Sequence, residues 1–256
     1  MKDIKELYPK TTVSIGDVAI KIEDLNSERF QNISFQIRWG EIVGLSGLMG
    51  AGKTELLRAV FRIDKIKKGK ILLEGSEIQD LTPSKKVKKG IVMLTEDRVR
   101  EGIFPDLSVS KNLVMIKIKD IMSGIFLDFE KIKETRKHLV NRLNIITFDS
   151  DIQVISQLSG GNQQKAIIGR LLFSKPKMLI LDEPTRGVDV AAKTEINNIM
   201  GQFLKEGGAI LIASSEVDEL LGICDKVIVL HEGNSIKTFQ RKELNKEALI
   251  KCMINI

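Results

Sequence analysis

Apolar residues along this chain gather in short runs, and each run ends in a polar loop. Two runs, 178–181 and 209–213, are uninterrupted, and 91–94 is a third. Short uninterrupted runs favour strands that are buried on both faces, which is typical of parallel sheets. Between the runs, apolar residues recur every three or four positions, as in 192–204, and this spacing predicts amphipathic helices. We therefore expect an α/β fold with a mostly parallel sheet and helices on both of its faces.

Two regions of the chain have a different pattern of apolar residues. Between residues 13 and 37 apolar positions alternate, which predicts an N-terminal antiparallel β subdomain with one wet face. From Ser108 to Asn144 the spacing turns helical, and Asp128 is the expected N-cap of a helix there. The predicted organisation comprises a core at 13–96 and 158–240, an inserted helical subdomain at 97–157 and a C-terminal tail at 241–256.

The stretch Gly47–Thr54 reads GLMGAGKT and matches G-x-x-x-x-G-K-S/T without a gap. An apolar strand precedes it and a helix-like run follows it, as a phosphate-binding loop requires, and this complete context disfavours the alternative of a simple glycine-rich turn. Glycines let backbone N–H groups converge on an anion. We expect Lys53 to reach the β- and γ-phosphates of a nucleotide and Thr54 to bind Mg²⁺. The predicted nucleotide contacts are Gly47, Leu48, Met49, Gly50, Ala51, Gly52, Lys53, Thr54 and Glu55.

The apolar run 178–181 ends in two acidic residues, Asp182 and Glu183. Downstream of a phosphate loop, we expect Asp182 to hold Mg²⁺ and Glu183 to polarise an attacking water. The alternative is that the two acids only cap a strand. A second candidate anion site is Ser159 with Gly160 and Gly161, at the start of a predicted helix. Taken alone, those residues could equally form a simple helix cap.

Composition narrows the functional classes. Hydrophobic residues make up 43% of the chain and charged residues 29%, as in soluble globular proteins. No apolar run approaches the length that spans a bilayer, and Cys224 and Cys252 form neither a disulfide framework nor a metal pair, which favours a cytosolic setting. The net charge is +6, with lysine runs at 65–70 and 85–89. Because no aromatic residues are interleaved with them, we expect no nucleic-acid partner.

Taken together, these residues resemble an ATP-binding cassette (ABC) ATPase of the P-loop type. The stretch 158–164, LSGGNQQ, resembles the signature motif of that family, 178–183 its Walker B strand, and 184–189 the loop that leads to an aspartate, here Asp189. The resemblance covers about 13–239. It is closest to the second nucleotide-binding half of ribose/galactose-type sugar importers, through GLMGAGKTEL, TEDRVREGIF, LSGGNQQK, LDEPTRGVDV and SSEVDELLGICDKV. By this resemblance 1–12 is a linker from a preceding half, 13–256 is one cassette, and Met1 was added to an excised C-terminal half.

The resemblance implies a function and partners. The chain would bind ATP with Mg²⁺, hydrolyse it, and energise import of a ribose-, galactose- or xylose-like monosaccharide. Its partners would be the other nucleotide-binding half, membrane permease subunits that dock near Glu96, and indirectly a sugar-binding protein. It would act in the cytoplasm, peripherally on the inner face of the cell membrane. The residues Ser159, Gly160, Gly161 and Gln163, with Asp189, would close over ATP held by the other half.

Two positions depart from most of the family. Glu96 stands where most cassettes carry glutamine, and Ser215 where most carry a histidine that contacts the γ-phosphate. We assign Ser215 to the catalytic site and Glu96 to both the catalytic and the metal site. Because the serine hydroxyl does not gain or lose a proton in the pH range in which histidine does, an alternative is a regulatory half that binds ATP but hydrolyses little. A third hypothesis is a cassette that acts on ribosomes or DNA. For stacking of adenine, Phe30 is a candidate, and the alternative is that Phe30, Ile33 and Phe35 are core.

Overall fold

The computed structural model describes residues 8–123 and 126–254. Residues 1–7 of the expected linker and the last two of the expected tail lie outside this range. The strands are β1 (Val18–Asn26), β2 (Ile33–Arg38), β3 (Ile42–Ser46), β4 (Lys68–Leu73), β5 (Ser76–Glu77), β6 (Ile91–Leu94), β7 (Met122–Ser123), β8 (Phe126–Leu127), β9 (Met178–Asp182), β10 (Ala209–Ala213), β11 (Lys226–His231) and β12 (Asn234–Gln240).

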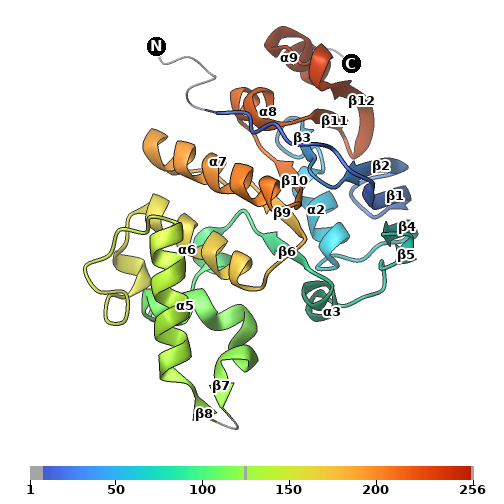
Figure 1. The fold of residues 1–256 in the computed structure, drawn as a ribbon. Helices are drawn as coiled ribbons and strands as arrows, with labels where there is room; N and C mark the ends of the chain where they lie inside the picture. The colour runs from blue at the N-terminus through green and yellow to red at the C-terminus, as the bar shows by residue number, and fades with distance from the viewer. Residues whose placement is uncertain (1–7, 124–125, 255–256) are drawn as a thin grey trace.

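Most of the helices fall between these strands along the chain, and η4 and α9 follow the last strand (Figure 1). The α-helices are α2 (Lys53–Phe61), α3 (Pro83–Lys88), α4 (Val109–Val114), α5 (Phe129–Arg142), α6 (Gly160–Phe173), α7 (Val190–Lys205), α8 (Val217–Ile223) and α9 (Lys246–Ile254). Shorter turns are the π-helical η1 (Arg98–Gly102) and the 3₁₀-helical η2 (Met115–Ile121), η3 (Ile155–Gln157) and η4 (Arg241–Glu243).

A six-stranded sheet in the order β12-β11-β3-β10-β9-β6 forms the centre of the molecule. All of its neighbouring strands are parallel except the β11–β12 pair. Ala213 is in register with Leu45 and with Asp182, and Leu94 with Leu181. The carboxyl ends of β3, β10, β9 and β6 therefore lie side by side, where ligands bind in sheets of this kind. The predicted α/β class is confirmed.

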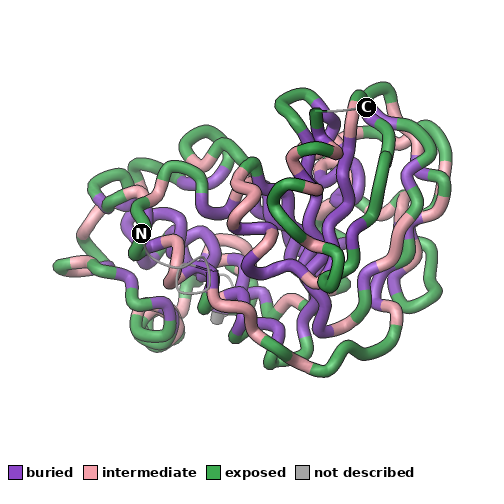
Figure 2. Tube along the Cα trace, turned by 90° about the horizontal axis from the view of Figure 1, so that it is seen from above, coloured by how far each residue is buried: buried purple, intermediate pink, exposed green. Residues whose placement is uncertain are grey.

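Alternation along the central strands divides the core in two. In β10, Ile210 and Ile212 join a cluster with α4, α6, α7 and α8, whereas Ala209, Leu211 and Ala213 join a second cluster with α2 and the N-terminal sheet. In Figure 1, α7 and α2 accordingly lie on opposite sides of β9 and β10. Figure 2 shows a buried interior surrounded by exposed loops. Burial on both faces explains the uninterrupted apolar runs.

The expected N-terminal antiparallel subdomain is present as a four-stranded sheet in the order β2-β1-β4-β5. Its apolar face, with Ile20, Ile22 and Ile37, packs into the same cluster as α2. This sheet therefore supports the helix that follows the phosphate loop.

The expectation of helix throughout 108–144 was partly wrong. Ser108 and Asp128 cap α4 and α5, and the N-cap predicted at Asp128 is confirmed. Between them, however, β7 pairs with β8 in a short antiparallel hairpin after η2. Helix α6 packs against α4 and α5. Within the described ranges, no helix combines the length and apolar character that crossing a membrane requires.

Candidate functional site

The loop from Gly47 to Gly52 joins the carboxyl end of β3 to the first turn of α2. Gly47 and Gly52 have φ angles of +154° and +97°, a region that residues with a β-carbon rarely adopt. A β-carbon on Gly47 would also lie 2.5 Å from the carbonyl oxygen of Leu230 in β11. Leu48, Met49 and Gly50 are exposed. The loop therefore presents its backbone to solvent at a helix N-terminus, as a phosphate-binding loop does.

Lys53 is the first residue of α2, and its side chain turns back over the loop. Its Nζ donates to the carbonyl oxygens of Gly47 at 2.6 Å and Leu48 at 3.3 Å. Burial lowers the pKa of this amine, and the charges of Glu183 and Asp182 offset part of the shift. The loop carbonyls thus hold the ammonium group beside the loop, where phosphate oxygens could replace them.

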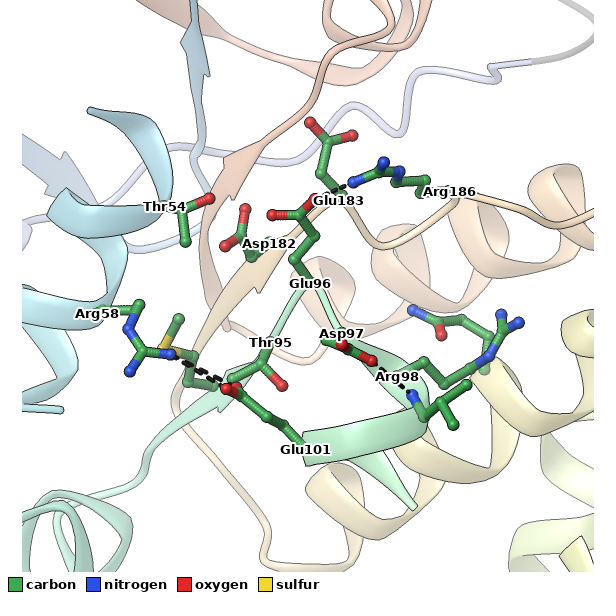
Figure 3. Close-up of a pocket in the computed structure, with 13 residues that line it drawn as sticks. Thr54, Arg58, Thr95, Glu96, Asp97, Arg98, Glu101, Asp182, Glu183 and Arg186 are labelled. Atoms are coloured by element: carbon green, nitrogen blue, oxygen red, sulfur yellow. Dashed lines mark hydrogen bonds and ion pairs between the residues drawn. The ribbon is translucent and has the colours of Figure 1, made fainter. Parts of the chain in front are cut away.

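Asp182 ends β9 and is 1% exposed. Neither of its carboxylate oxygens has a hydrogen-bond partner among the described residues. Burial raises the pKa of this carboxyl to about 6, while the nearby Thr54 hydroxyl and Lys53 act in the opposite direction. Figure 3 shows Thr54 and Asp182 facing each other between α2 and β9. A buried carboxylate without partners beside a hydroxyl fits Mg²⁺, which prefers few carboxylates and several waters.

Glu183 follows Asp182 directly and has a φ angle of +48°. Its backbone N–H donates to the Ala213 carbonyl at 2.9 Å, which fixes this residue to β10. Ser215 Oγ donates to Glu183 Oε2 at 2.9 Å. Non-glycine residues in the left-handed region cluster at functional sites. Glu183 and Ser215 both line the cavity over the phosphate loop, so the carboxylate is available to a water there.

Two adjoining cavities share Thr54, Glu96, Glu183 and Arg186. The cavity over the phosphate loop measures about 370 Å³, and its neighbour beside η1 about 550 Å³. Glu96 follows β6 and forms an ion pair with Arg186 between the cavities (Figure 3). The structure therefore brings together the predicted residues of the phosphate loop and of three further strand ends. These are Lys53, Thr54, Glu55, Glu96, Asp182, Glu183 and Ser215.

The second candidate anion site lies at the start of α6, apart from this cluster. Ser159 caps the helix, and its Oγ accepts a backbone N–H of the first turn at 3.4 Å, which confirms the predicted cap. The described residues that line the two cavities do not include Ser159, Gly160 or Gly161. The start of α6 packs instead on the start of α7. The contact is close, since a β-carbon on Gly161 would lie 2.5 Å from the β-carbon of Ala192. Asp189 caps α7 beside it.

Gln163 points into the protein. The residue is 9% exposed, and its amide nitrogen donates to the carbonyls of Ile155, Ser156 and Leu158 at 3.2, 3.4 and 3.1 Å. Within this chain the amide therefore braces the loop before α6.

Phe30 is 1% exposed and belongs to the cluster that contains Ile33 and α2. A buried ring offers no face to a nucleobase. The alternative that Phe30 is a core residue is confirmed, and its candidacy for adenine stacking was wrong.

Three polar residues at the site were not found from the sequence. Arg186 pairs with Glu96 across 90 positions. Arg98 Nη1 donates to the Gly160 carbonyl at 3.2 Å, so η1 contacts the start of α6. Glu219, in α8, accepts hydrogen bonds from Thr185 and Ser214. The one available signal was that Arg186 and Arg98 stand in polar loops directly after strands of a parallel sheet.

Comparison with known proteins shows which family this chain matches. Residues 30–186 match the family described as ABC transporter. The chain belongs to the ABC transporter family. Its phosphate loop and its Asp182–Glu183 pair both lie within the matched range. The start of α6 also falls within that range.

Particular relatives agree with this assignment. The chain is 41% identical over 97% of its length to a ribose import ATP-binding protein, RbsA, of Streptococcus agalactiae, and 39% identical over 97% to that of Bacillus subtilis. It spans about half the length of both relatives, 50% in each case. A solved nucleotide-free ATP-binding cassette superposes with a TM-score of 0.77 at 22% identity, covering 94% of this chain and 100% of that one. That likeness supports the fold alone.

Proposed function

We propose that this chain is the C-terminal ATP-binding half of an importer for a monosaccharide such as ribose, galactose or xylose. One observation carries the proposal: buried Asp182, without hydrogen-bond partners among the described residues, faces Thr54 at the end of a phosphate loop whose Lys53 is held by loop carbonyls. Family membership and the names of the relatives, which are ribose import proteins, support it. Binding of ATP with Mg²⁺ closes two halves together, and hydrolysis reopens them.

Each side chain in the cluster has a role that suits its position. Lys53 exchanges the Gly47 carbonyl for β- and γ-phosphate oxygens. Thr54 and Asp182 would hold Mg²⁺, with Glu96 beside them, and the ion would supply positive charge against the phosphates. Glu183 accepts a proton from the attacking water. The other phosphate-loop residues, from Gly47 to Gly52, supply backbone N–H groups, and Glu55 lies at the rim of the same cavity.

The start of α6 serves a different ATP. Ser159, Gly160 and Gly161 do not line either of the two cavities beside this chain's own phosphate loop. We propose that these residues, with Gln163 and Asp189, close over ATP held by the other nucleotide-binding half. Backbone N–H groups at a helix N-terminus are well suited to the γ-phosphate.

Further partners follow from the same proposal. Membrane permease subunits dock near Glu96, a sugar-binding protein acts through them, and the chain works in the cytoplasm on the inner face of the membrane. We propose no nucleic-acid partner. In support, Lys86 from the second lysine run is fully buried, and its Nζ donates to the Val60 carbonyl at 2.6 Å, so the run does not form a continuous basic face.

Substitution of Lys53 tests nucleotide binding. Lys53→Ala removes a charge-assisted contact to phosphate, and we expect ATP affinity to fall roughly tenfold to a hundredfold at constant Mg²⁺. Calorimetric titration of ATP measures the change, with Lys85→Ala as a control on an exposed lysine away from the cavities. Unchanged affinity in Lys53→Ala would show that the loop does not hold the phosphates.

A second candidate is a regulatory half that binds ATP but hydrolyses little of its own. The observation in its favour is the hydrogen bond from Ser215 to Glu183, because a serine at this position places no titratable group beside the γ-phosphate. The two candidates separate in single-turnover hydrolysis of ATP bound to the full two-half protein. Hydrolysis at this half that persists in the wild type and is lost in Glu183→Gln supports the first candidate.

A further inference from the structure

Arg186 stands in the loop that follows Glu183, and its side chain is 59% exposed. Among the described residues that line the cavity over the phosphate loop, the cations are Lys53 and Arg186. Arg186 also lines the adjoining cavity with Thr54 and Asp182. Its guanidinium therefore lies at the junction of the phosphate loop and the expected metal position, where Figure 3 shows it paired with Glu96.

The charges around this junction favour a change of partners when a triphosphate arrives. Three carboxylates, Glu55, Glu96 and Glu183, line the same cavity as the two cations. The pair between Glu96 and Arg186 is exposed, 38% and 59% by side chain, and exposed ion pairs contribute little net stability. Phosphate binds a guanidinium by two parallel hydrogen bonds, a stronger interaction than an exposed carboxylate pair offers.

The neighbouring residues leave this role open to Arg186. Ser215 is uncharged, and its hydroxyl is engaged with Glu183. The Lys53 ammonium group is engaged with the Gly47 carbonyl. The residue after Arg186, Gly187, has a φ angle of +69°, and no atom lies within 4 Å of where its β-carbon would stand, so no neighbour crowds that side of the chain.

We propose that Arg186 binds the γ-phosphate of ATP in this half, and that Glu96 holds the guanidinium in place until ATP arrives. Arg186 thereby supplies the positive charge that Ser215 does not. The proposal rests on the proposed nucleotide function and adds to it a residue that distinguishes ATP from ADP, because ADP lacks the group that Arg186 binds.

Paired titrations with ATP and ADP test the assignment. In the full chain with Mg²⁺, we expect Arg186→Ala to lower ATP affinity roughly tenfold and to leave ADP affinity within about twofold, since one charge-assisted contact is lost only with ATP. Arg186→Lys should keep part of the affinity. Arg142→Ala is the matched control, because Arg142 forms a similar exposed ion pair with Glu206 away from both cavities.

Other results would overturn the assignment. If Arg186→Ala lowers the affinities for ATP and ADP equally, Arg186 does not contact the γ-phosphate. If Arg186→Ala raises the affinity for ATP, Arg186 only competes for contact with Glu96 and does not bind the phosphate. Lys53→Ala separates these failures from failure of the proposed function: no effect of Lys53→Ala on either nucleotide contradicts nucleotide binding at this loop. Loss in Lys53→Ala with an unchanged ATP-to-ADP ratio in Arg186→Ala contradicts the role of Arg186 alone.

A double-mutant cycle without metal tests the exchange itself. In excess chelator, Glu96→Gln should raise ATP affinity several-fold, because Arg186 is then free for the phosphate. In the Arg186→Ala background the same substitution should give a clearly smaller gain, from removal of one negative charge alone. Equal gains in both backgrounds would contradict the proposed change of partner.

Discussion

Glu219 is the most deeply buried carboxyl near the site. It is 0% exposed and accepts hydrogen bonds from Thr185 Oγ1 at 2.9 Å and Ser214 Oγ at 2.6 Å. Those hydroxyls belong to the two loops that carry Glu183 and Ser215. One carboxyl in α8 therefore ties together the loops that present both groups to the cavity. Burial raises its pKa to about 7, and the charges of Glu216 and Glu183 add to the shift.

This raised pKa predicts how stability depends on pH. Because the pKa lies above the ordinary 4.5, folding favours the protonated form, so the stabilisation is complete below about pH 4.5 and is lost as pH rises through about 7. Glu219→Gln keeps the shape without the proton. The quantity to measure is the difference in the free energy of unfolding between the wild type and Glu219→Gln. We expect this difference to shift against the wild type by about 2 to 3 kcal/mol from pH 4.5 to 8. Urea unfolding measures it, and a constant difference contradicts it.

At the scale of residues, the placement of a side chain could be predicted where it depends on local order along the chain. The spacing of Lys53 and Thr54 and the position of Asp182 at a strand end are local, and the structure brings these residues together. The pair of Glu96 with Arg186 depends instead on two loops meeting in space. The sequence carries no periodicity that marks such a meeting.

The elements were predictable to the extent that caps and periodicity decide them. Ser159 and Asp128 begin α6 and α5 as expected. The hairpin of β7 and β8 was not expected, because each of its strands has only two residues, Met122–Ser123 and Phe126–Leu127. Short paired strands carry too few residues to show a period of two.

The segment before β1 is held by contact with a helix. A β-carbon on Gly222 of α8 would lie 2.2 Å from Tyr8 Cβ and 2.9 Å from the Tyr8 carbonyl oxygen. The Tyr8 hydroxyl donates to Glu216 Oε2 at 2.8 Å, next to Ser215. Burial, together with the hydrogen bond and charge of Glu216, raises the pKa of Tyr8 well above its ordinary 10. The segment is therefore linked to the loop that carries Ser215.

Gly222→Ala should release this segment. Alanine in a helix interior ordinarily stabilises a protein by about 1 kcal/mol relative to glycine. A loss of stability in Gly222→Ala would therefore report the lost contact with Tyr8. Because the chain has one tyrosine, absorbance of its phenolate follows Tyr8 directly. We expect the Tyr8 pKa to return towards 10 in Gly222→Ala but not in Gly16→Ala, where a β-carbon would meet Trp39 at an ordinary 3.5 Å. An unchanged titration in Gly222→Ala contradicts the docking.

At the scale of the whole molecule, the fold was predictable because the buried strands of a parallel sheet are long enough to show as apolar runs. The carboxyl ends of β3, β6, β9 and β10 then had to meet at one edge. What a single chain cannot reveal is the use of the start of α6. Gly160 lies outside both cavities, so its role in our account depends on a second nucleotide-binding half.

Phosphate release per chain, followed as the protein concentration is raised at saturating ATP and Mg²⁺, tests the central claim most directly. If the phosphate loop of one half works with the start of α6 of another, turnover per chain should rise with concentration as two copies associate. Gly160→Asp, which places a negative charge where a γ-phosphate would arrive, should abolish that rise. Brisk turnover that is independent of concentration in a chain that light scattering shows to be monomeric, and that Gly160→Asp leaves intact, would contradict the account.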